Sequence, residues 1–444
     1  MKTFKIGGVH PEAQKLSNEI SVETFPLPKQ ATIFVTQSLG APAVPVVAKG
    51  DKVKVGQLLA KAEAFICANV HSPFSGTVNK IEPVADFTGY KKPAIIIDVE
   101  GDEWDESIDT SEEIVSEIKL SRKEIIDRMK ACGIVGLGGA CFPTHVKYML
   151  PEGKSADYIL VNAAECEPYI TTDYRMMLEQ TEQCLVGIEA LLIASGAPKA
   201  LIGIENNKPE AIRHLQEATK THPKIEVVPL KTKYPQGAEK QLIQALTGRT
   251  VPNGRLPIDA GCIVNNIATT HAVYEAVQKN KPLIETYTTV TGKHLANRKN
   301  YKIRLGTPLK EVLDAVGIPE NTGKIISGGP MMGKAMANTN TFFVKGMSSI
   351  LFLDASESKR IPESNCLRCG KCIQACPMGL EPYLFRMLAV HNRLDDLEAH
   401  GIMNCIECGC CQSGCPAHIP LLDTVKTGKS KTGAMIKSRQ VKKS

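Results

Sequence analysis

The sequence is poor in aromatic residues and in long apolar runs. Aromatic residues make up 5% of its 444 residues, and Trp104 is the single tryptophan. The longest apolar candidate, residues 184–198, is interrupted by Glu189 and falls short of the roughly 18 residues of a membrane-spanning helix. The start of the chain has no long apolar segment either, so the sequence predicts no signal peptide and a location in the cytosol.

The chain also lacks an excess of charge of one sign, except at its carboxyl end. The formal net charge is +6, but residues 426–444 hold seven basic residues and no acidic one. Removing these seven charges leaves a body with a net charge of −1, which argues against nucleic-acid binding as a main function. The basic segment 426–444 is either a disordered, solvated tail or a contact for anionic lipid or an acidic partner.

Cysteine, in contrast, is plentiful. An odd count of 15 cysteines in a chain without a predicted export signal favours reduced thiols and metal ligation over a disulfide framework. Eight of them form two copies of C-x2-C-x2-C-x3-C-P, the spacing of bacterial two-cluster ferredoxins. In that pattern, three close cysteines bind one cubane and the fourth reaches the neighbouring cluster.

The spacing therefore predicts two [4Fe–4S] clusters in a domain over residues 355–425. One cluster is assigned to Cys366, Cys369, Cys372 and Cys415, and the other to Cys405, Cys408, Cys411 and Cys376. A pair of zinc sites is the alternative, because C-x2-C is also a zinc-binding spacing, but zinc has no use for the proline after each last cysteine. Cys410 fits neither set and is expected to serve packing.

Residues 31–100 have the pattern of a small β domain. Segments 51–60 (DKVKVGQLLA) and 70–78 (VHSPFSGTV) resemble the two halves of the biotinyl/lipoyl-type barrel-sandwich fold. Those carrier domains present a modified lysine on the hairpin between the halves, whereas residues 63–71 contain no lysine. We therefore expect residues 1–100 to form an unmodified barrel-sandwich domain with a structural or interaction role, followed by an acidic linker over 101–120.

The next domain, residues 121–284, alternates helices and strands. Ser121 and Glu124 have the spacing of a capping box that starts a helix over 121–130. The alternation continues with helices over 178–195 and 209–219 and strands over 158–162, 200–205, 225–229 and 262–266. This order is typical of an α/β fold.

Two stretches of this domain could bind a nucleotide. The glycine-dense segment 133–144 (GIVGLGGACFPT) can cradle a phosphate with its backbone amides, although a tight structural turn is the alternative. The strand over 158–162 ends at Asn162 and is followed by Glu165 and Glu167, at the edge where α/β sheets bind ligands. Two carboxylates there could bind ribose hydroxyls, and a solvated turn is again the alternative.

These motifs resemble two related families. Gly138-Gly139-Ala140-x-Phe142-Pro143-Thr144-x-x-Lys147 is similar to the flavin loop of the NADH-oxidising flavoprotein subunit of respiratory complex I, and Glu165-x-Glu167-Pro168, Gly237-x-Glu239 and Asn265-Asn266 follow in that subunit's order. A fuller resemblance, over nearly the whole chain, is to the RnfC subunit of Rnf complexes. It includes residues 7–11 (GGVHP), the barrel-sandwich, residues 165–175 (ECEPYITTDYR) and both cysteine motifs.

The resemblance implies a site for FMN and NADH. It puts the FMN phosphate near Gly138, Gly139 and Thr144, the ring or ribityl chain near Asn162, Asn265 and Asn266, and NADH near Phe142, Lys147, Glu165, Glu167 and Glu239. Ala164 replaces an aspartate near the complex I flavin, and Cys141 replaces a loop glycine. These departures affect the detailed flavin contacts and not the expected fold.

The resemblance also implies the remaining architecture. A β-grasp (SLBB-like) module is expected over 285–344, with strands over 288–292 and 301–305. Its helix over 308–316 would bury one face, made of Leu309, Val312, Leu313 and Val316. Helices over 381–391 and 394–399 predict a helical cluster domain. The expected fold class is multidomain α/β: a barrel-sandwich domain, a Rossmann-like FMN/NADH domain, a β-grasp domain and an α-helical two-cluster ferredoxin domain.

Flavin and clusters in one chain predict electron transfer. NADH gives two electrons as hydride, clusters accept one at a time, and FMN converts between the two. The resemblance implies a subunit of a ferredoxin:NAD oxidoreductase coupled to ion translocation, lying peripherally on the cytoplasmic side of the cell membrane. Its implied partners are other Rnf-type membrane and iron–sulfur subunits, NAD(H), and ferredoxin through the complex. No side chain need act as a catalytic acid or base.

Three other functions share parts of this pattern. A diaphorase subunit of a soluble NAD-linked hydrogenase or formate dehydrogenase would share the glycine loop but gives no reason for the barrel-sandwich. A non-enzymatic electron-carrier scaffold would hold clusters beside an empty flavin pocket. A sodium-pumping quinone reductase subunit would share the front half of the chain without the cysteine motifs.

Overall fold

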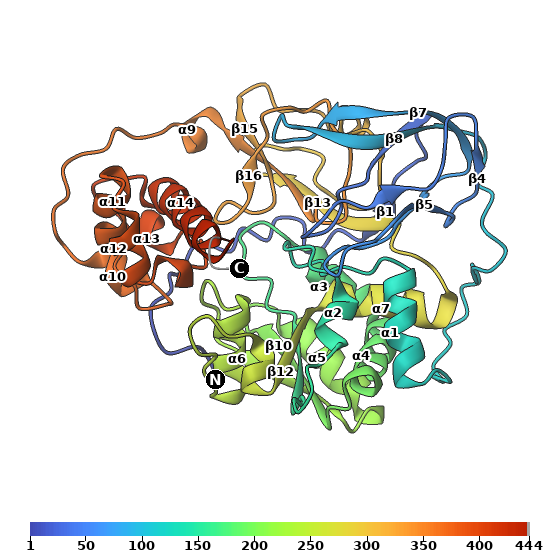
Figure 1. The fold of residues 1–444 in the computed structure, drawn as a ribbon, viewed down its shortest axis with the longest axis horizontal. Coiled ribbons are helices and arrows are strands. Elements are labelled where there is room, and N and C mark those ends of the chain that lie inside the picture. The colour runs from blue at the N-terminus through green and yellow to red at the C-terminus, as the bar shows by residue number, and fades with distance from the viewer. Residues whose placement is uncertain (442–444) are drawn as a thin grey trace.

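The computed structural model describes residues 1–441 and folds them into four parts (Figure 1). A β domain (blue) and a sheet domain (orange) lie along the top, an α/β domain (green to yellow) lies below them, and a helical domain (red) lies at the left. The N-terminal segment runs between these parts. Lys2 forms a β-bridge with Leu230, the Gly8 amide donates to the Ala375 carbonyl, and β1 (Val22–Thr24) joins the sheet domain.

The first domain consists of two small sheets around one apolar core. Their strand orders are β2-β8-β7-β4 and β3-β5-β6. The strands are β2 (Gln30–Phe34), β3 (Val44–Pro45), β4 (Lys52–Val53), β5 (Leu58–Lys61), β6 (Val70–His71), β7 (Gly76–Ala85) and β8 (Lys91–Val99). Ile33, Leu59 and Ile97, from both sheets, are fully buried in the shared core.

The acidic segment after the first domain contains no helix or strand, which agrees with the predicted linker. Contacts with two domains nevertheless hold it in place. Trp104 forms a β-bridge with Val55, and Ile108 is buried. Lys279 Nζ donates to Asp109 Oδ2 at 2.6 Å. The segment therefore connects the β domain to the α/β domain along a fixed path.

The α/β domain is built on a parallel sheet with strand order β11-β10-β9-β12. The strands are β9 (Tyr158–Asn162), β10 (Lys199–Glu205), β11 (Ile225–Leu230) and β12 (Cys262–Asn266). The helices are α1 (Arg122–Ala131), α2 (Thr144–Tyr148), α3 (Thr172–Glu179), α4 (Thr181–Ser195), α5 (Pro209–Ala218), α6 (Glu239–Thr247) and α7 (Ile267–Lys279). The predicted capping box of Ser121 and Glu124 starts α1. Since the strands are parallel, their carboxyl ends meet at one edge.

The single helix predicted over 178–195 is wrong at its start. The backbone breaks at Gln180, where φ is −129°, and separates α3 from α4. Within α4, a Cβ on Gly187 would lie 1.9 Å from the Thr270 carbonyl oxygen of α7. This close helix contact requires glycine in the middle of α4.

The sheet domain is a six-stranded mixed sheet with order β1-β14-β13-β17-β15-β16. Its further elements are β13 (Glu285–Gly292), β14 (Lys299–Arg304), α8 (Leu309–Val316), β15 (Thr322–Ser327), β16 (Lys334–Ala335) and β17 (Ser349–Asp354). The helix α8 buries the predicted face of Leu309, Val312, Leu313 and Val316. The strand β17 pairs with both β13 and β15, so a domain that ended at residue 344 would lose an interior strand.

The helical domain contains the helices around the cysteine motifs. They are α10 (Lys371–Ala375), α11 (Pro382–Val390), α12 (Leu394–Ala399), α13 (Cys410–Ser413) and α14 (Leu421–Val441). The helix α9 (Ala355–Ser358) follows β17 and packs on β15 and β17 of the sheet domain. The prediction of a disordered tail is wrong for residues 426–441. These residues lie in α14, which packs against α11 and α12. Arg439 Nη1 donates to Glu398 Oε2 at 2.7 Å. The last three residues, 442–444, lie outside the described part.

Candidate functional site

The glycine-dense turn leads into α2 at the carboxyl edge of the parallel sheet. The Gly136 amide donates to the Phe142 carbonyl at 2.9 Å, which closes the turn. A Cβ on Gly138 would lie 3.3 Å from Cβ of Asn266, and Gly139 has a φ of +110° with nothing within 4 Å of a Cβ. The turn therefore packs its backbone against the end of β12 and leaves open backbone at Gly139, as a phosphate cradle requires.

Buried polar atoms without partners lie beside this turn. Asn265 Nδ2 donates to the Tyr148 hydroxyl at 2.6 Å, and Asn266 Nδ2 donates to Asp173 Oδ2 at 2.7 Å. Within the described residues, Asn265 Oδ1 and Thr144 Oγ1 are buried and have no hydrogen-bond partner. Since buried polar atoms are normally paired, these two atoms fit contacts to a bound polar group such as FMN.

Asn162 connects this edge to the loop before α6. Its Nδ2 donates to the Gly237 carbonyl at 2.9 Å. A Cβ on Gly237 would lie 3.1 Å from the Asn162 amide and 3.4 Å from Cys166 Sγ. The end of β9 and the loop over 234–237 are thus in direct contact.

Lys147, predicted to lie near NADH, occupies the same edge. Its Nζ donates to the Val264 carbonyl of β12 at 2.6 Å. Burial lowers the pKa of Lys147, and the charge of Glu239 opposes that shift. Glu239 is the first residue of α6, and Phe142 is half-buried in the glycine turn. Contact of these three residues with NADH stays a prediction.

Glu165 braces the loop that follows β9. Its Oε1 accepts from the Asp173 amide at 2.7 Å, and its Oε2 lies 3.7 Å from Lys15 Nζ. Lys15 Nζ also donates to the carbonyls of Glu165, Glu167 and Ile170 at 2.6–2.9 Å. Burial, and next the charge of Glu165, raise the pKa of Asp173 to about 7. The contacts of Glu165 are therefore internal to the protein.

The side chain of Glu167 contacts the sheet domain and Tyr234. It accepts from the Met332 amide at 2.7 Å and from the Met331 amide at 3.2 Å. The Tyr234 hydroxyl lies 3.4 Å from Glu167 Oε1. Burial raises the pKa of Glu167 to about 6, although the two amides oppose the shift. The loop over 327–333, expected from sequence to be structural, thus provides the main partners of Glu167.

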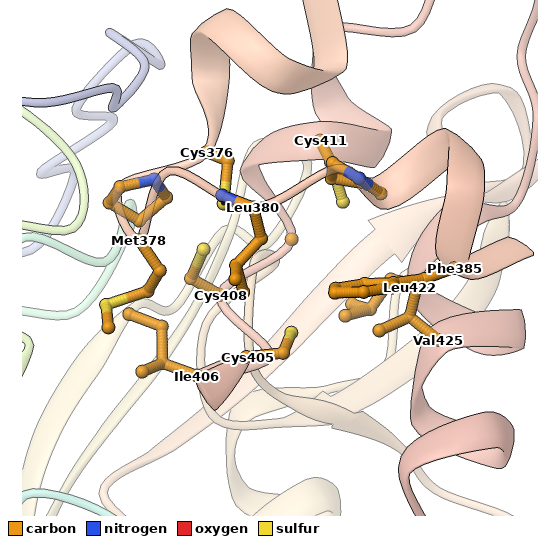
Figure 2. Close-up of a pocket in the computed structure, with 13 residues that line it drawn as sticks. Cys376, Met378, Leu380, Phe385, Cys405, Ile406, Cys408, Cys411, Leu422 and Val425 are labelled. Carbon is orange, nitrogen blue, oxygen red and sulfur yellow. Dashed lines mark hydrogen bonds between the residues drawn. The ribbon is translucent and has the colours of Figure 1, made fainter. Parts of the chain in front are cut away.

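Four of the predicted cluster ligands surround one cavity of the helical domain (Figure 2). They are Cys376, Cys405, Cys408 and Cys411, and are named here the inner set. Apolar side chains of Leu380, Phe385 and Val425 line the same cavity. The Tyr234 hydroxyl of the α/β domain donates to the Cys408 carbonyl at 2.9 Å, so the inner set touches the domain that carries the glycine turn.

The other four ligands line a second cavity. They are Cys366, Cys369, Cys372 and Cys415, and are named here the outer set. Every residue over 361–369 is exposed, and this segment has neither helix nor strand. The structure thus brings together the two sets that the spacing predicted, each with its fourth cysteine from the other motif. Cys410 is fully buried against Tyr234, in the packing role expected of it.

The donor chemistry of both sets fits iron–sulfur clusters. Each set offers four thiols from two short loops, and thiolate is the ligand that iron–sulfur clusters take. Among residues 1–441, no group of three or more His, Cys, Asp or Glu side chains converges on one ion position. Each thiolate around a cubane binds a different iron, so a cubane does not require such convergence.

Comparison with known proteins covers nearly the whole chain. Family models match at residues 2–102 (RnfC barrel sandwich hybrid domain), 129–275 (Nuo51 FMN-binding domain) and 358–416 (4Fe-4S dicluster domain). The C subunit of the proton-translocating ferredoxin:NAD(+) oxidoreductase complex of Clostridium ljungdahlii is 44% identical over 394 residues, which cover 87% of this chain and 84% of that one. The chain belongs to the RnfC family.

A second RnfC relative leads to the same assignment. The C subunit of the Na(+)-translocating ferredoxin:NAD(+) oxidoreductase complex of Acetobacterium woodii is 39% identical over 404 residues, which cover 90% of each chain. A solved NAD+-reducing [NiFe]-hydrogenase in the H2-reduced state is more distant, with a TM-score of 0.49 and 19% identity over 69% of this chain and 61% of that one. The three family-model matches confirm the barrel-sandwich, FMN-binding and iron–sulfur parts of the predicted fold. None of the helices within residues 1–441 is both long enough and apolar enough to span a bilayer.

Sequence reasoning missed two residues that organise this RnfC site. Tyr234 links the α/β domain to Cys408, and Lys15 holds the loop after β9 from the N-terminal segment. The sequence could have indicated Tyr234, because this residue follows β11 at the carboxyl edge, where α/β sheets bind ligands. It could not have indicated Lys15, since the partners of Lys15 lie some 150 residues away along the chain.

Proposed function

We propose that this protein exchanges hydride between NAD(H) and FMN in its α/β domain and passes electrons singly through two [4Fe–4S] clusters in its helical domain. The observation that carries the proposal is the division of eight cysteines into two four-member sets, one of which touches the α/β domain through Tyr234. An electron path needs this adjacency, because the two kinds of cofactor must lie close to each other.

When bound, FMN accepts hydride and releases single electrons, and each cluster carries one electron at a time. The chain's own residues hold and orient these groups. Gly138 and Gly139 offer backbone amides to the phosphate, and Thr144 Oγ1 and Asn265 Oδ1 have free hydrogen-bonding capacity for the flavin. Asn162 and Asn266 complete the edge on which the flavin would lie.

The substrate side of the proposal rests on Lys147. Its ammonium carries three donors and uses one on the Val264 carbonyl, so two can bind a nucleotide. Glu239, whose charge acts on Lys147, and Phe142 of the glycine turn would contact NADH with it. Hydride transfer depends on distance and stacking, so no acid or base is assigned.

The surroundings of the protein follow from its relatives. Those proteins are named as subunits of ferredoxin:NAD(+) oxidoreductase complexes that translocate protons or Na(+). We infer the same role here, as a peripheral subunit on the cytoplasmic side of the cell membrane. Its partners would be other Rnf-type membrane and iron–sulfur subunits, and ferredoxin through the complex. We also assign a Rossmann-like character to residues 121–284 and an SLBB-like β-grasp to the sheet domain.

Cofactor analysis tests the whole proposal. Protein purified without oxygen should contain one FMN and about eight iron atoms and eight sulfides per chain, as two cubanes require. Addition of NADH should bleach the flavin. Zinc in place of iron and sulfide would overturn the cluster assignment, and iron without flavin would leave an electron carrier that does not use NADH.

Substitution of Lys147 tests the NADH site. Lys147→Ala should slow NADH-driven flavin bleaching about tenfold or more, because a buried donor to the nucleotide is lost. Lys147→Arg should recover part of the rate, and FMN and iron content should stay unchanged in both. Lys154→Ala, an exposed lysine paired with Asp259, is the matched control. Unchanged bleaching in Lys147→Ala would remove Lys147 from the site.

A further inference from the structure

Tyr234 lies where three domains meet. Its side chain is almost completely buried, in an apolar cluster with Ala375, Cys408 and Cys410. Its hydroxyl donates to the Cys408 carbonyl at 2.9 Å and lies 3.4 Å from Glu167 Oε1. One phenol ring therefore connects a ligand of the inner set to the loop that follows β9.

The backbone of Tyr234 is held from the other side by the N-terminal segment. Tyr234 and Val9 exchange two backbone hydrogen bonds of 2.9 Å each. The neighbouring Gly8 amide donates to the Ala375 carbonyl at 2.9 Å, and a Cβ on Gly7 would lie 2.3 Å from the Cys376 carbonyl oxygen. The N-terminal segment is thus packed between Tyr234 and the turn that carries Cys376.

Glu167 completes the same contact from the loop that follows β9. It accepts from the amides of Met331 and Met332, and the Met331 carbonyl would lie 3.0 Å from a Cβ on Gly409, next to Cys408. Its loop neighbour Cys166 packs in the Tyr234 cluster and accepts from the Gly237 amide at 3.4 Å. Glu167 and Tyr234 are therefore parts of one contact, named here the Tyr234 joint.

We propose that the Tyr234 joint positions the inner cysteine set against the flavin domain for electron passage, and that Glu167 acts through Tyr234 and not on NADH. The inference rests on the proposed function and names the residues that couple its two halves. Oxidation of NADH to NAD+ releases two electrons and one proton. With both kinds of cofactor bound, the two electrons would cross the joint one at a time, and the inner cluster would pass the first electron to the outer cluster before it accepts the second.

In this proposal Tyr234 is a positioning residue, and its substitution should change a specific set of measurements. Tyr234→Phe removes one hydroxyl and keeps the ring, so flavin bleaching by NADH should be unchanged. Inner-cluster reduction, followed by rapid-freeze EPR, should slow roughly three- to tenfold, the effect of one hydrogen bond on an equilibrium. The midpoint potential of the inner cluster should fall, because a donor to the Cys408 carbonyl no longer stabilises the reduced, more negative cluster.

Glu167→Gln separates the two roles considered for Glu167. At the joint, it slows inner-cluster reduction and leaves the KM for NADH unchanged; at an NADH site, it raises that KM and slows flavin bleaching. Tyr301→Phe is the matched control, because Tyr301 is a buried tyrosine of the sheet domain that packs on Phe25. Should Tyr234→Phe fail to fold, Glu167→Gln carries the test.

The outcomes distinguish this inference from the proposed function. Wild-type protein without flavin or clusters overturns the proposed function before any variant is compared. Wild-type protein that reduces its clusters while Tyr234→Phe and Glu167→Gln match Tyr301→Phe in rate and potential overturns the joint alone. A lower melting temperature in Tyr234→Phe without a change in rate or potential has the same meaning, since it shows a purely structural contact.

Discussion

The two cysteine sets share one spacing but lie in different surroundings. In the inner set, Cys376 and Cys408 are each 8% exposed, and the Cys408 carbonyl accepts from the Tyr234 hydroxyl. In the outer set, Cys366 and Cys369 lie in an irregular segment that is exposed throughout. The motif alone therefore sets which thiols belong together, whereas the rest of the chain sets what surrounds them. Because solvent access and nearby hydrogen bonds tune a cluster, two identical motifs should hold two unlike clusters.

The hydrogen bonds at the two sets differ in their origin. Two side chains from distant elements reach carbonyls of the inner set: the Tyr234 hydroxyl at Cys408 and Lys429 Nζ of α14 at Cys405, at 2.9 and 2.7 Å. Local backbone contacts occur at both sets, from the His418 amide to the Cys415 carbonyl at 3.1 Å and from the Gly379 amide to the Cys376 carbonyl at 3.2 Å, so the added side-chain donors are what distinguishes the inner set. This pattern favours the inner cluster as the one next to the flavin and the outer cluster as the one next to a partner.

The largest difference between the two clusters should be their rate of loss on exposure to air. The outer cluster should be lost first, because solvent and oxygen reach its loop directly, and about half of the iron should leave in a fast phase. Iron analysis and EPR after timed exposure to air measure this loss. NADH should still bleach the flavin and reduce the remaining cluster after the fast phase.

A variant identifies which cluster is lost. Cys369→Ser removes an outer ligand, so its residual EPR signal should match the signal of wild-type protein after the fast phase. Loss of all iron in a single phase, or a residual signal unlike that of Cys369→Ser, would contradict the difference in protection between the two sets.

Two glycines with similar backbone conformations sharpen the comparison. Gly7 (φ +64°) packs on the inner set, where a Cβ would lie 2.3 Å from the Cys376 carbonyl oxygen. At Gly370 (φ +73°), next to Cys369 of the outer set, a Cβ would have nothing within 4 Å. Alanine at either site should cost about 1 kcal/mol for the left-handed backbone. Gly7→Ala should cost roughly 1–3 kcal/mol more, because the turn at Cys376 must move.

Thermal unfolding of both variants, with the cluster content of each, measures this difference. Gly7→Ala should also weaken the EPR signal of the inner cluster, and Gly370→Ala should leave it intact. Equal stability losses in the two variants would show that the N-terminal segment does not support the inner set.

The sequence predicted much of the site because the relevant patterns are local. The C-x2-C-x2-C-x3-C-P spacing defines its own loop, and the face of α8 follows from helical periodicity. The strands β9 and β12 were predicted with correct bounds because each is a short apolar run that ends in a polar residue.

What the sequence could not predict depends on contacts between distant segments. The strand β17 belongs to the sheet only through its pairing with β13 and β15, and α14 is ordered by packing on α11 and α12. Glu167 shows the same limit inside the site. Its motif resembles one that surrounds NADH, but its partners are amides more than 160 residues away, which no spacing within the motif reveals.

The two clusters should also differ in how their midpoint potentials respond to the charges on and near α14. Lys429 Nζ donates to the Cys405 carbonyl at 2.7 Å and to Glu407 Oε1 at 2.9 Å, so a cation lies beside the inner set. Lys429→Met removes this cation and leaves the Glu407 carboxylate behind, which destabilises the reduced cluster. The inner midpoint potential should fall by roughly 60 mV, which corresponds to about a tenfold change in a one-electron equilibrium.

Glu407→Gln should raise the same potential, because the Lys429 charge is then unopposed. The outer potential should stay constant in both variants, and redox titration followed by EPR separates the two signals. Parallel shifts of both potentials would mean that α14 acts through the whole domain and not through the Cys405 carbonyl.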